Sequence, residues 1–99
     1  MLRPAISEEA FFEQIRELAQ RTHWKLYHTY DSRRSYGGFF DVVAGKAGHP
    51  LVLAELKTEK GKLTPDQMEW QEIVRQSTGL QQYLWRPAQL QAIADIMSG

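Results

Sequence analysis

The sequence predicts an α/β fold, a mixed four-stranded sheet flanked by helices in the order α-β-β-β-α-β-α. Three observations predict this class. Apolar residues recur at three- and four-residue spacing in three segments, as in amphipathic helices. Four short apolar or alternating runs are typical of strands and cover residues 24–30, 39–43, 51–58 and 82–85. The last two runs enclose one of the helical segments, and such a β-α-β unit predicts two parallel strands.

The composition indicates one soluble globular domain that spans residues 1–99. Hydrophobic residues make up 42% and charged residues 24%, values that are ordinary for such domains. The chain contains no cysteine, which excludes disulfides and thiolate metal sites. No apolar run approaches the roughly 20 residues of a membrane span, and the first residues lack the apolar core of a secretory signal. We therefore expect a cytoplasmic protein with no membrane partner.

The charges are unevenly distributed along the chain, although the net charge is zero. Residues 21–62 hold eight Lys or Arg against four Asp or Glu, a balance of +4, and the rest of the chain carries −4. A basic middle between acidic helices favours one surface that faces phosphate groups.

The first helix is expected from Glu8 to about Arg21, with Ser7 as its N-cap and acidic residues in its first turn. Its apolar stripe comprises Phe11, Phe12, Ile15, Leu18 and Ala19. The first strand follows at residues 24–30, because apolar and aromatic residues alternate there. One face of this strand comprises Trp24, Leu26, His28 and Tyr30. Residues 31–38 are polar, basic and end in two glycines, which predicts a loop.

The runs at residues 39–43 and 51–58 are expected to form a hairpin around residues 45–50, which are rich in turn residues. The second run is apolar on both faces, as in a central strand. Side chains two positions apart on a strand share a face, so Glu55 and Lys57 stand side by side. The hairpin would bring Asp41 beside Glu55.

The second helix is expected to begin at Pro65, with Thr64 as N-cap and Gln67 completing a capping box. We expect it to end at about Ser77, before Gly79. The remaining elements are a strand at residues 82–85 and a last helix that opens at Pro87.

The charged side chains of the hairpin suggest a chemical role. Two carboxylates about 4 Å apart repel by roughly 4 kcal/mol at an effective dielectric constant near 20. A proton, the ammonium group of Lys57 or a divalent cation would relieve this repulsion between Asp41 and Glu55. Oxygen-only ligands suit Mg²⁺ or Mn²⁺, and such a site supports phosphodiester hydrolysis. The spacing alone favours the simpler alternative, an acid–lysine pair that closes a strand edge.

The motif Gly38-Phe-Phe-Asp41 is followed, fourteen residues after the aspartate, by Glu55-Leu-Lys57. This arrangement resembles the active-site pattern of the PD-(D/E)XK nuclease superfamily. More specifically, the chain resembles the stand-alone VRR-NUC domains of phages and prophages. Further matching stretches are Tyr27-His-Thr-Tyr-Asp-Ser-Arg-Arg-Ser35, Ala54-Glu-Leu-Lys-Thr-Glu-Lys-Gly-Lys-Leu-Thr-Pro-Asp-Gln67, Trp70 and Leu84-Trp-Arg-Pro87. The resemblance implies a restriction-endonuclease-like core and a metal-dependent endodeoxyribonuclease that acts in the cytoplasm of a bacterial host.

The resemblance also implies roles for individual residues. It implies Mg²⁺ or Mn²⁺ as cofactor, with ligands from the Asp41 and Glu55 carboxylates and the Leu56 backbone carbonyl. Lys57 would orient the attacking water or stabilise charge on the phosphate. Glu8 would reach the metal. An equally good interpretation is that Glu8 is only an acid that the helix dipole stabilises in the first turn. Gln67 would face the active site as a catalytic residue, unless it is only a capping-box residue.

The candidate DNA-binding residues are basic and flank the proposed site. They are Arg33 and Arg34 in the loop after the first strand, Lys60 and Lys62 after the strand that carries Glu55, and His28. Arginine suits bidentate contacts to phosphate. For His28, a hydrogen-bonded structural histidine is the favoured interpretation, and DNA contact is the alternative.

The chain departs from the family pattern at one position. The family usually has proline before its aspartate, and here that position is Phe40. Proline would fix φ at the entry to the strand. The aspartate itself is present, so the change brings the local geometry and the reaction rate into question rather than the reaction class.

Stand-alone members of the family are similar to Holliday-junction resolvases, which implies branched DNA, a four-way junction or flap, as partner. Two symmetric cuts require two active sites, hence a C₂ homodimer. Phe11 and Phe12 are candidates for its surface, because adjacent side chains on a helix point in different directions. The alternatives are a DNA-binding module with weak or lost cleavage and a structural partner in a phage or repair complex.

Overall fold

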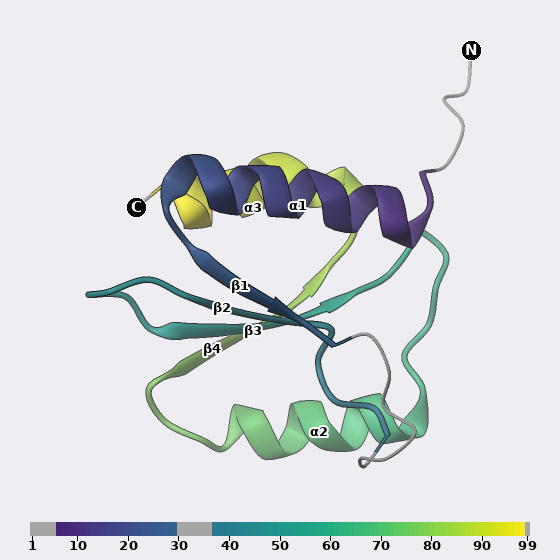
Figure 1. Cartoon of the computed structure of the whole chain (residues 1–99). Coiled ribbons are helices and arrows are strands. Elements are labelled where there is room, and N and C mark those ends of the chain that lie inside the picture. Colours follow the sequence, from purple (N-terminus) through teal and green to yellow (C-terminus); the bar gives the residue numbers. More distant parts are fainter. Residues whose placement is uncertain (1–5, 30–36, 99) are drawn as a thin grey trace.

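The computed structural model describes residues 6–29 and 37–98. A four-stranded sheet forms the middle layer, with helices α1 and α3 on one face and α2 on the other (Figure 1). The elements are α1 Glu8–Thr22, β1 Lys25–His28, β2 Val42–Gly45, β3 Leu51–Leu56, α2 Pro65–Arg75, β4 Leu80–Trp85, the 3₁₀ turn η1 Pro87–Gln89 and α3 Leu90–Met97. The predicted fold class and element order are confirmed.

The strands lie in the order β1-β2-β3-β4. The pairs β1–β2 and β2–β3 are antiparallel, and Val42 lies opposite Ala54. The pair β3–β4 is parallel, and Leu56 lies beside Trp85. The predicted hairpin and the predicted parallel β-α-β unit are therefore both present.

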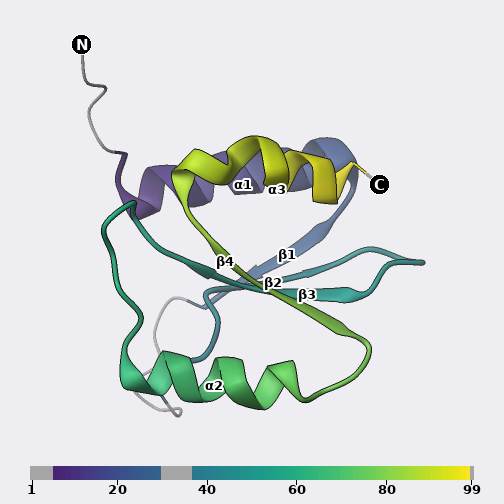
Figure 2. The same cartoon turned by 180° about the vertical axis from the view of Figure 1, so that it is seen from behind.

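Strand β3 is the centre of the core, because both of its faces are covered. Val52, Ala54 and Leu56 belong to the larger hydrophobic cluster, formed with α1 and α3. Leu53 packs on the opposite face against Phe40 and against Val74 of α2. Seen from behind, α3 crosses the same sheet face beside α1 (Figure 2). The predicted central strand, apolar on both faces, is confirmed.

Helix α1 begins and ends at recognisable caps. The Ser7 hydroxyl accepts a hydrogen bond from the Ala10 N–H at 3.0 Å, as expected for an N-cap. His23 adopts the left-handed conformation, with φ of 65°, and its N–H donates to the Ala19 carbonyl. This cap turns the chain into β1. The next residue, Trp24, is buried, and its indole N–H donates to the Met97 carbonyl at 2.9 Å.

The structure contradicts the prediction that Phe11 and Phe12 offer a dimer surface. Phe11 is fully buried and Phe12 is 8% exposed. Phe12 stacks on His28 of β1 with 4.0 Å between ring centroids. An apolar stripe on a helix is about 100° wide or more, so it accommodates two adjacent residues when a sheet edge covers the second one.

Several predicted boundaries differ from the structure. The second strand begins at Val42 rather than Phe39. The Phe39 ring packs edge-on against the Trp70 ring, with 5.0 Å between the ring centroids, and Phe40 packs into the core on the α2 side of the sheet. The first strand is limited to Lys25–His28, and Tyr30 lies outside the described residues.

The boundaries of the second half of the chain also shift by a few residues. Strand β3 ends at Leu56, and β4 begins at Leu80, two residues earlier than predicted. Helix α2 ends at Arg75 instead of about Ser77. The last helix opens at Pro87 as a 3₁₀ turn and becomes α-helical at Leu90. In the described part of the chain, no helix has the length and apolar character needed to cross a membrane.

The turn that leads into Asp41 depends on Gly38. Its φ is +86°, and a Cβ there would lie 2.5 Å from the Asp66 carbonyl carbon of α2. Gly48 in the β2–β3 turn has a similar φ of +83°, and a Cβ there would have no neighbour within 4 Å.

The two glycines therefore make a matched pair. We expect Gly48→Ala to lower the free energy of unfolding by about 1–2 kcal/mol, the cost of a left-handed backbone conformation. Gly38→Ala adds a clash with backbone and should lower it by at least about 2 kcal/mol more. Urea unfolding measures both changes, provided that the variants and the parent protein have equal m-values. Equal losses would contradict the proposed close contact between Gly38 and α2.

Candidate active site

The two predicted carboxylates lie opposite each other at one end of the hairpin. Asp41 immediately precedes β2, and Glu55 is the next-to-last residue of β3. The register pairs Val42 with Ala54, so the next position pairs Asp41 with Glu55. The Thr29 N–H donates to the Asp41 carbonyl at 2.9 Å, which extends the β1–β2 ladder to this row. The predicted proximity of Asp41 and Glu55 is confirmed.

Each carboxylate is held by a hydrogen bond from a fixed donor. Asp41 Oδ2 accepts from the Leu56 backbone N–H at 2.9 Å. Glu55 is 2% exposed, and its Oε1 accepts from Gln67 Nε2 at 2.9 Å. Donors on a strand and on a capped helix restrict the side-chain rotamers, so the pair is ordered in advance of any ligand.

Burial gives Glu55 an unusual protonation state. Loss of hydration raises the pKa of Glu55, and a hydrogen bond to Asp41 together with the Asp41 charge raises it further, to about 9. The positive charge of Lys57 acts in the opposite direction. At neutral pH and without a cation, the Asp41–Glu55 pair therefore retains one proton, which relieves the repulsion between the two carboxylates.

Glu8 at the start of α1 is electrostatically coupled to the same site. Its pKa is raised first by burial and second by the negative charge of Asp41, while the charge of Lys57 lowers it. Helix α1 therefore brings a third carboxylate into the field of the pair. Glu8 is only partly buried and keeps solvent access.

Gln67 forms the predicted capping box and also faces Glu55, while its catalytic role stays a prediction. Its backbone N–H donates to Thr64 Oγ1 at 3.2 Å, and its Oε1 accepts from the Thr64 N–H at 2.9 Å, which completes the capping box. Its remaining donor, Nε2, bonds to Glu55. One side chain thus caps the N-terminus of α2 and orients the buried carboxyl group.

Lys57 follows β3 directly and is half-buried. Its backbone N–H donates to the Trp85 carbonyl at 3.0 Å, which prolongs the parallel pairing with β4 by one residue. Its charge affects the pKa of both Glu55 and Glu8, so its side chain belongs to the same electrostatic group.

The predicted DNA-binding residues differ in their exposure and in their position in the chain. Lys60 and Lys62 are exposed in the segment between β3 and α2. Arg33 and Arg34 lie outside the described residues. His28 is half-buried, stacks on Phe12, and helps to line a pocket of about 330 Å³. The other residues of this pocket are Glu8, Glu9, Phe12, Glu13 and Leu56.

The donor set is suited to a hard cation. Asp41 and Glu55 offer carboxylate oxygens at one strand end, as Mg²⁺ and Mn²⁺ prefer. Within residues 6–29 and 37–98, no three His, Asp or Glu side chains converge as a metal-binding group. The set of metal ligands therefore stays a prediction.

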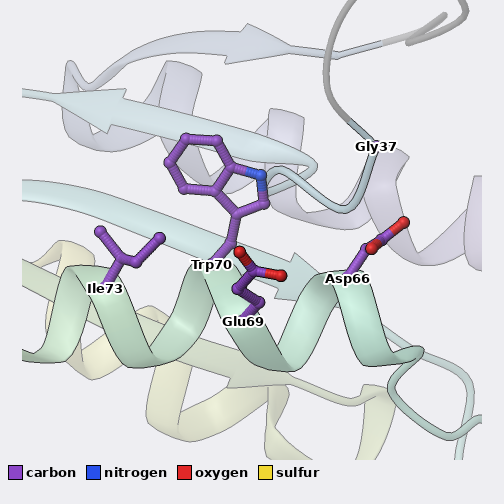
Figure 3. A pocket seen from close by; sticks show the side chains of 5 residues that line it. All are labelled: Gly37, Asp66, Glu69, Trp70 and Ile73. Atoms are coloured by element: carbon purple, nitrogen blue, oxygen red, sulfur yellow. The ribbon is translucent and has the colours of Figure 1, made fainter.

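A second pocket, of about 310 Å³, lies beside α2 and does not include the carboxylate pair (Figure 3). Its lining comprises Gly37, Asp66, Glu69, Trp70 and Ile73. Figure 3 shows Trp70 and Ile73 rising from the helix, with Glu69 beside Trp70 and Asp66 nearer the start of the helix. No sequence pattern predicts this pocket, because the residues that α2 contributes to it follow the ordinary helical pattern.

Comparison with known proteins supports the fold. No family profile and no curated protein matches the sequence. The structure is similar to a solved structure described as a VRR_NUC domain, with a TM-score of 0.72 and 17% sequence identity. The match covers 89% of this chain and 94% of the other. The chain therefore has the fold of a VRR-NUC domain, as its sequence motifs predict.

The raised pKa of Glu55 makes stability depend on pH. In the unfolded chain this carboxyl group has its ordinary pKa of 4.5, and in the folded protein the value is about 9. Between these values the folded protein holds a proton that the unfolded chain has released, so stability falls as pH rises. We expect the metal-free protein to be less stable at pH 8.5 than at pH 5.5.

Glu55→Gln tests this expectation, because the amide imitates the protonated acid and keeps an oxygen for Gln67. In EDTA, the free energy of unfolding of the variant should depend less on pH. At pH 8.5 it should exceed that of the parent protein by on the order of 2 kcal/mol. Urea unfolding at both pH values measures this, with the same change at the exposed Glu17 as control. Parallel profiles for Glu55→Gln and the parent protein would refute the raised pKa.

Proposed function

We propose that the protein is a metal-dependent, structure-selective DNA endonuclease, and specifically a Holliday-junction resolvase. The observation that carries this proposal is the Asp41–Glu55 pair at adjacent strand ends, with Glu55 buried and Lys57 close by. The VRR-NUC fold and the motif resemblance support a nuclease over other chemistry that such a pair can perform.

The proposed cofactor is Mg²⁺ or Mn²⁺, held by Asp41, Glu55 and the Leu56 carbonyl, with Glu8 as a further candidate. When bound, such an ion neutralises phosphate charge and lowers the pKa of a coordinated water. Because Glu55 retains a proton at neutral pH, cation binding competes with that proton, and metal affinity should increase with pH.

The residues of the chain have separable tasks in this proposal. The Leu56 N–H holds Asp41 and the Gln67 amide holds Glu55, so both acids keep their positions when DNA enters. Lys57 supplies a positive charge for the phosphate as negative charge develops on it, or it orients the attacking water. Its position directly after the strand that carries Glu55 suits both tasks.

Contacts to the DNA backbone are assigned to exposed basic residues. Lys60 and Lys62 lie in the segment that follows Lys57, so phosphates bound there would be near the proposed site. Arg33 and Arg34 remain candidates on the basis of the sequence. Cleavage of a four-way junction further requires two active sites, for which we propose a C₂ homodimer.

Phe40 is compatible with cleavage. It is 1% exposed and packs with Leu53 and Val74. A buried aromatic side chain can fix the chain at this position, where proline would do so through φ. Asp41, the next residue, lies opposite Glu55 despite the substitution. No feature of the described residues therefore favours loss of activity at this position.

Binding of Mn²⁺ should stabilise the folded protein without any DNA. A ligand that binds only the folded state stabilises it by about 2.7 kcal/mol at a concentration of 100 times its Kd. We expect Mn²⁺ to raise the midpoint of thermal unfolding of the parent protein at pH 8, and EDTA to reverse the rise. Asp41→Asn should abolish the rise, while Glu17→Gln should leave it unchanged. An equal rise in Asp41→Asn would place the cation elsewhere.

Cleavage assays test the reaction itself. Labelled four-way junction, flap and linear duplex are incubated with the protein and Mg²⁺, Mn²⁺ or EDTA. We expect metal-dependent cleavage of the junction, reduced at least about 100-fold by Asp41→Asn and by Lys57→Ala. Junction binding should be largely kept in Asp41→Asn, because the basic residues contact phosphate independently of the metal.

The other outcomes of this assay identify the alternatives. Binding without cleavage under every metal condition would indicate a DNA-binding module. Absence of both binding and cleavage would indicate a structural partner of a larger complex. Cleavage by Asp41→Asn at the parental rate would show that the active site is wrongly assigned.

A further inference from the structure

We propose that Arg86 is a positioning residue for Lys57, acting through the loop of residues 58–63. The inference rests on the proposed function, because it concerns the lysine assigned to the phosphate. Arg86 directly follows β4, whose last residue, Trp85, lies beside Leu56 of β3. It therefore extends from a fixed point of the sheet, next to the strand end that precedes Lys57.

The guanidinium group of Arg86 binds the loop backbone at several points. Its Nη1 donates to the carbonyl oxygens of Thr58 at 2.6 Å and Gly61 at 2.8 Å, with a longer contact to Glu59 at 3.3 Å. One guanidinium nitrogen carries two hydrogens, so the two short bonds are the principal ones. Charge-assisted bonds of this length are stronger than neutral ones, and a neutral side chain could not replace them fully.

A second contact fastens the same loop to η1. Glu59 Oε1 accepts from the Ala88 backbone N–H at 2.6 Å. The backbone N–H of Arg86 donates to Gln89 Oε1 at 2.9 Å, which fixes the start of η1. The loop also closes on itself, because the Gly61 N–H donates to the Thr58 carbonyl at 3.2 Å. The segment after Lys57 is thus attached to the β4–η1 junction by both backbone and side chain.

The fastened loop lies against the side chain of Lys57. A Cβ on Gly61 would lie 3.3 Å from Lys57 Cδ and 3.5 Å from Lys57 Cβ. Gly61 therefore lies next to the methylene chain of the lysine. An unrestrained lysine side chain has many rotamers. A neighbour that excludes some of them lowers the entropy lost when the ammonium group engages a phosphate. Arg86, through Gly61, would hold Lys57 ready for that contact.

Lys60 and Lys62 belong to the same loop, so Arg86 could also act on DNA binding. The two effects differ kinetically. A displaced Lys57 lowers kcat, whereas displaced phosphate contacts raise the KM and the dissociation constant for the junction. The proposal assigns the main effect to kcat.

Arg86→Gln removes the charge and most of the donors. Arg75→Gln is the matched control, because Arg75 is exposed and pairs only with Glu72 of its own helix among the contacts described. We expect Arg86→Gln to lower kcat on the junction at least about tenfold, since small misplacements of catalytic groups have effects of this size. The junction dissociation constant should change less than kcat, and Arg75→Gln should change neither.

A double-mutant cycle shows whether the effect passes through Lys57. In the Lys57→Ala background, Arg86→Gln should cause little further loss, because the side chain it positions is gone. Gly61→Ala is a second variant that keeps Arg86 but places a methyl group against the lysine, and it should also lower kcat. The same fold loss from Arg86→Gln in both backgrounds would overturn the proposal.

A measurement that is independent of cleavage separates this inference from the proposed function. NMR order parameters of the Lys57 side chain, and hydrogen exchange of the amides in residues 58–62, report the order of the loop and lysine directly. Arg86→Gln should lower the order parameters and speed the exchange, while Arg75→Gln should not. Unchanged values would overturn the proposal even if the parent protein cleaves DNA, and a parent protein without cleavage would refute only the proposed function.

Discussion

The pairing of Asp41 with Glu55 across the β2–β3 hairpin is the constraint on which the rest of the site depends. Two acids face each other there, and one of them is almost completely buried. Such a pair is unfavourable as two charges, and in the absence of a cation it keeps a proton. Burial of this kind needs a specific set of partners, and the neighbouring elements supply them.

Two hydrogen-bond donors hold the pair, and a third acid adds its charge to the site. Helix α2 provides Gln67, β3 provides the Leu56 N–H, and α1 brings Glu8 into the same electrostatic field. The hydrophobic clusters on the two faces of β3 hold these elements in place. The cores therefore determine the geometry of the site, although their residues take no part in the chemistry.

Local sequence patterns were sufficient to predict much of this arrangement. The turn residues between the two strands set the register that joins Asp41 to Glu55, and the spacing from Thr64 to Gln67 predicted the capping box. The first residue of β2 was predicted wrongly, because Phe39 and Phe40 have strand-like side chains but are drawn out of the sheet by contacts with α2. The contacts of Arg86 with residues 58–61 had no local signal, since they join segments 25 to 28 positions apart.

We expect Glu55 to be protonated in the metal-free protein and, in the proposed enzyme, to be ionised when a divalent cation binds beside Asp41. Carbon-detected NMR of the Glu55 carboxyl group, titrated in EDTA and again in saturating Mg²⁺, measures both states. We predict an apparent pKa of about 9 in EDTA. In Mg²⁺ the group should be ionised at pH 7. A carboxyl group that titrates near its ordinary pKa in EDTA, or that does not respond to Mg²⁺, would contradict this expectation.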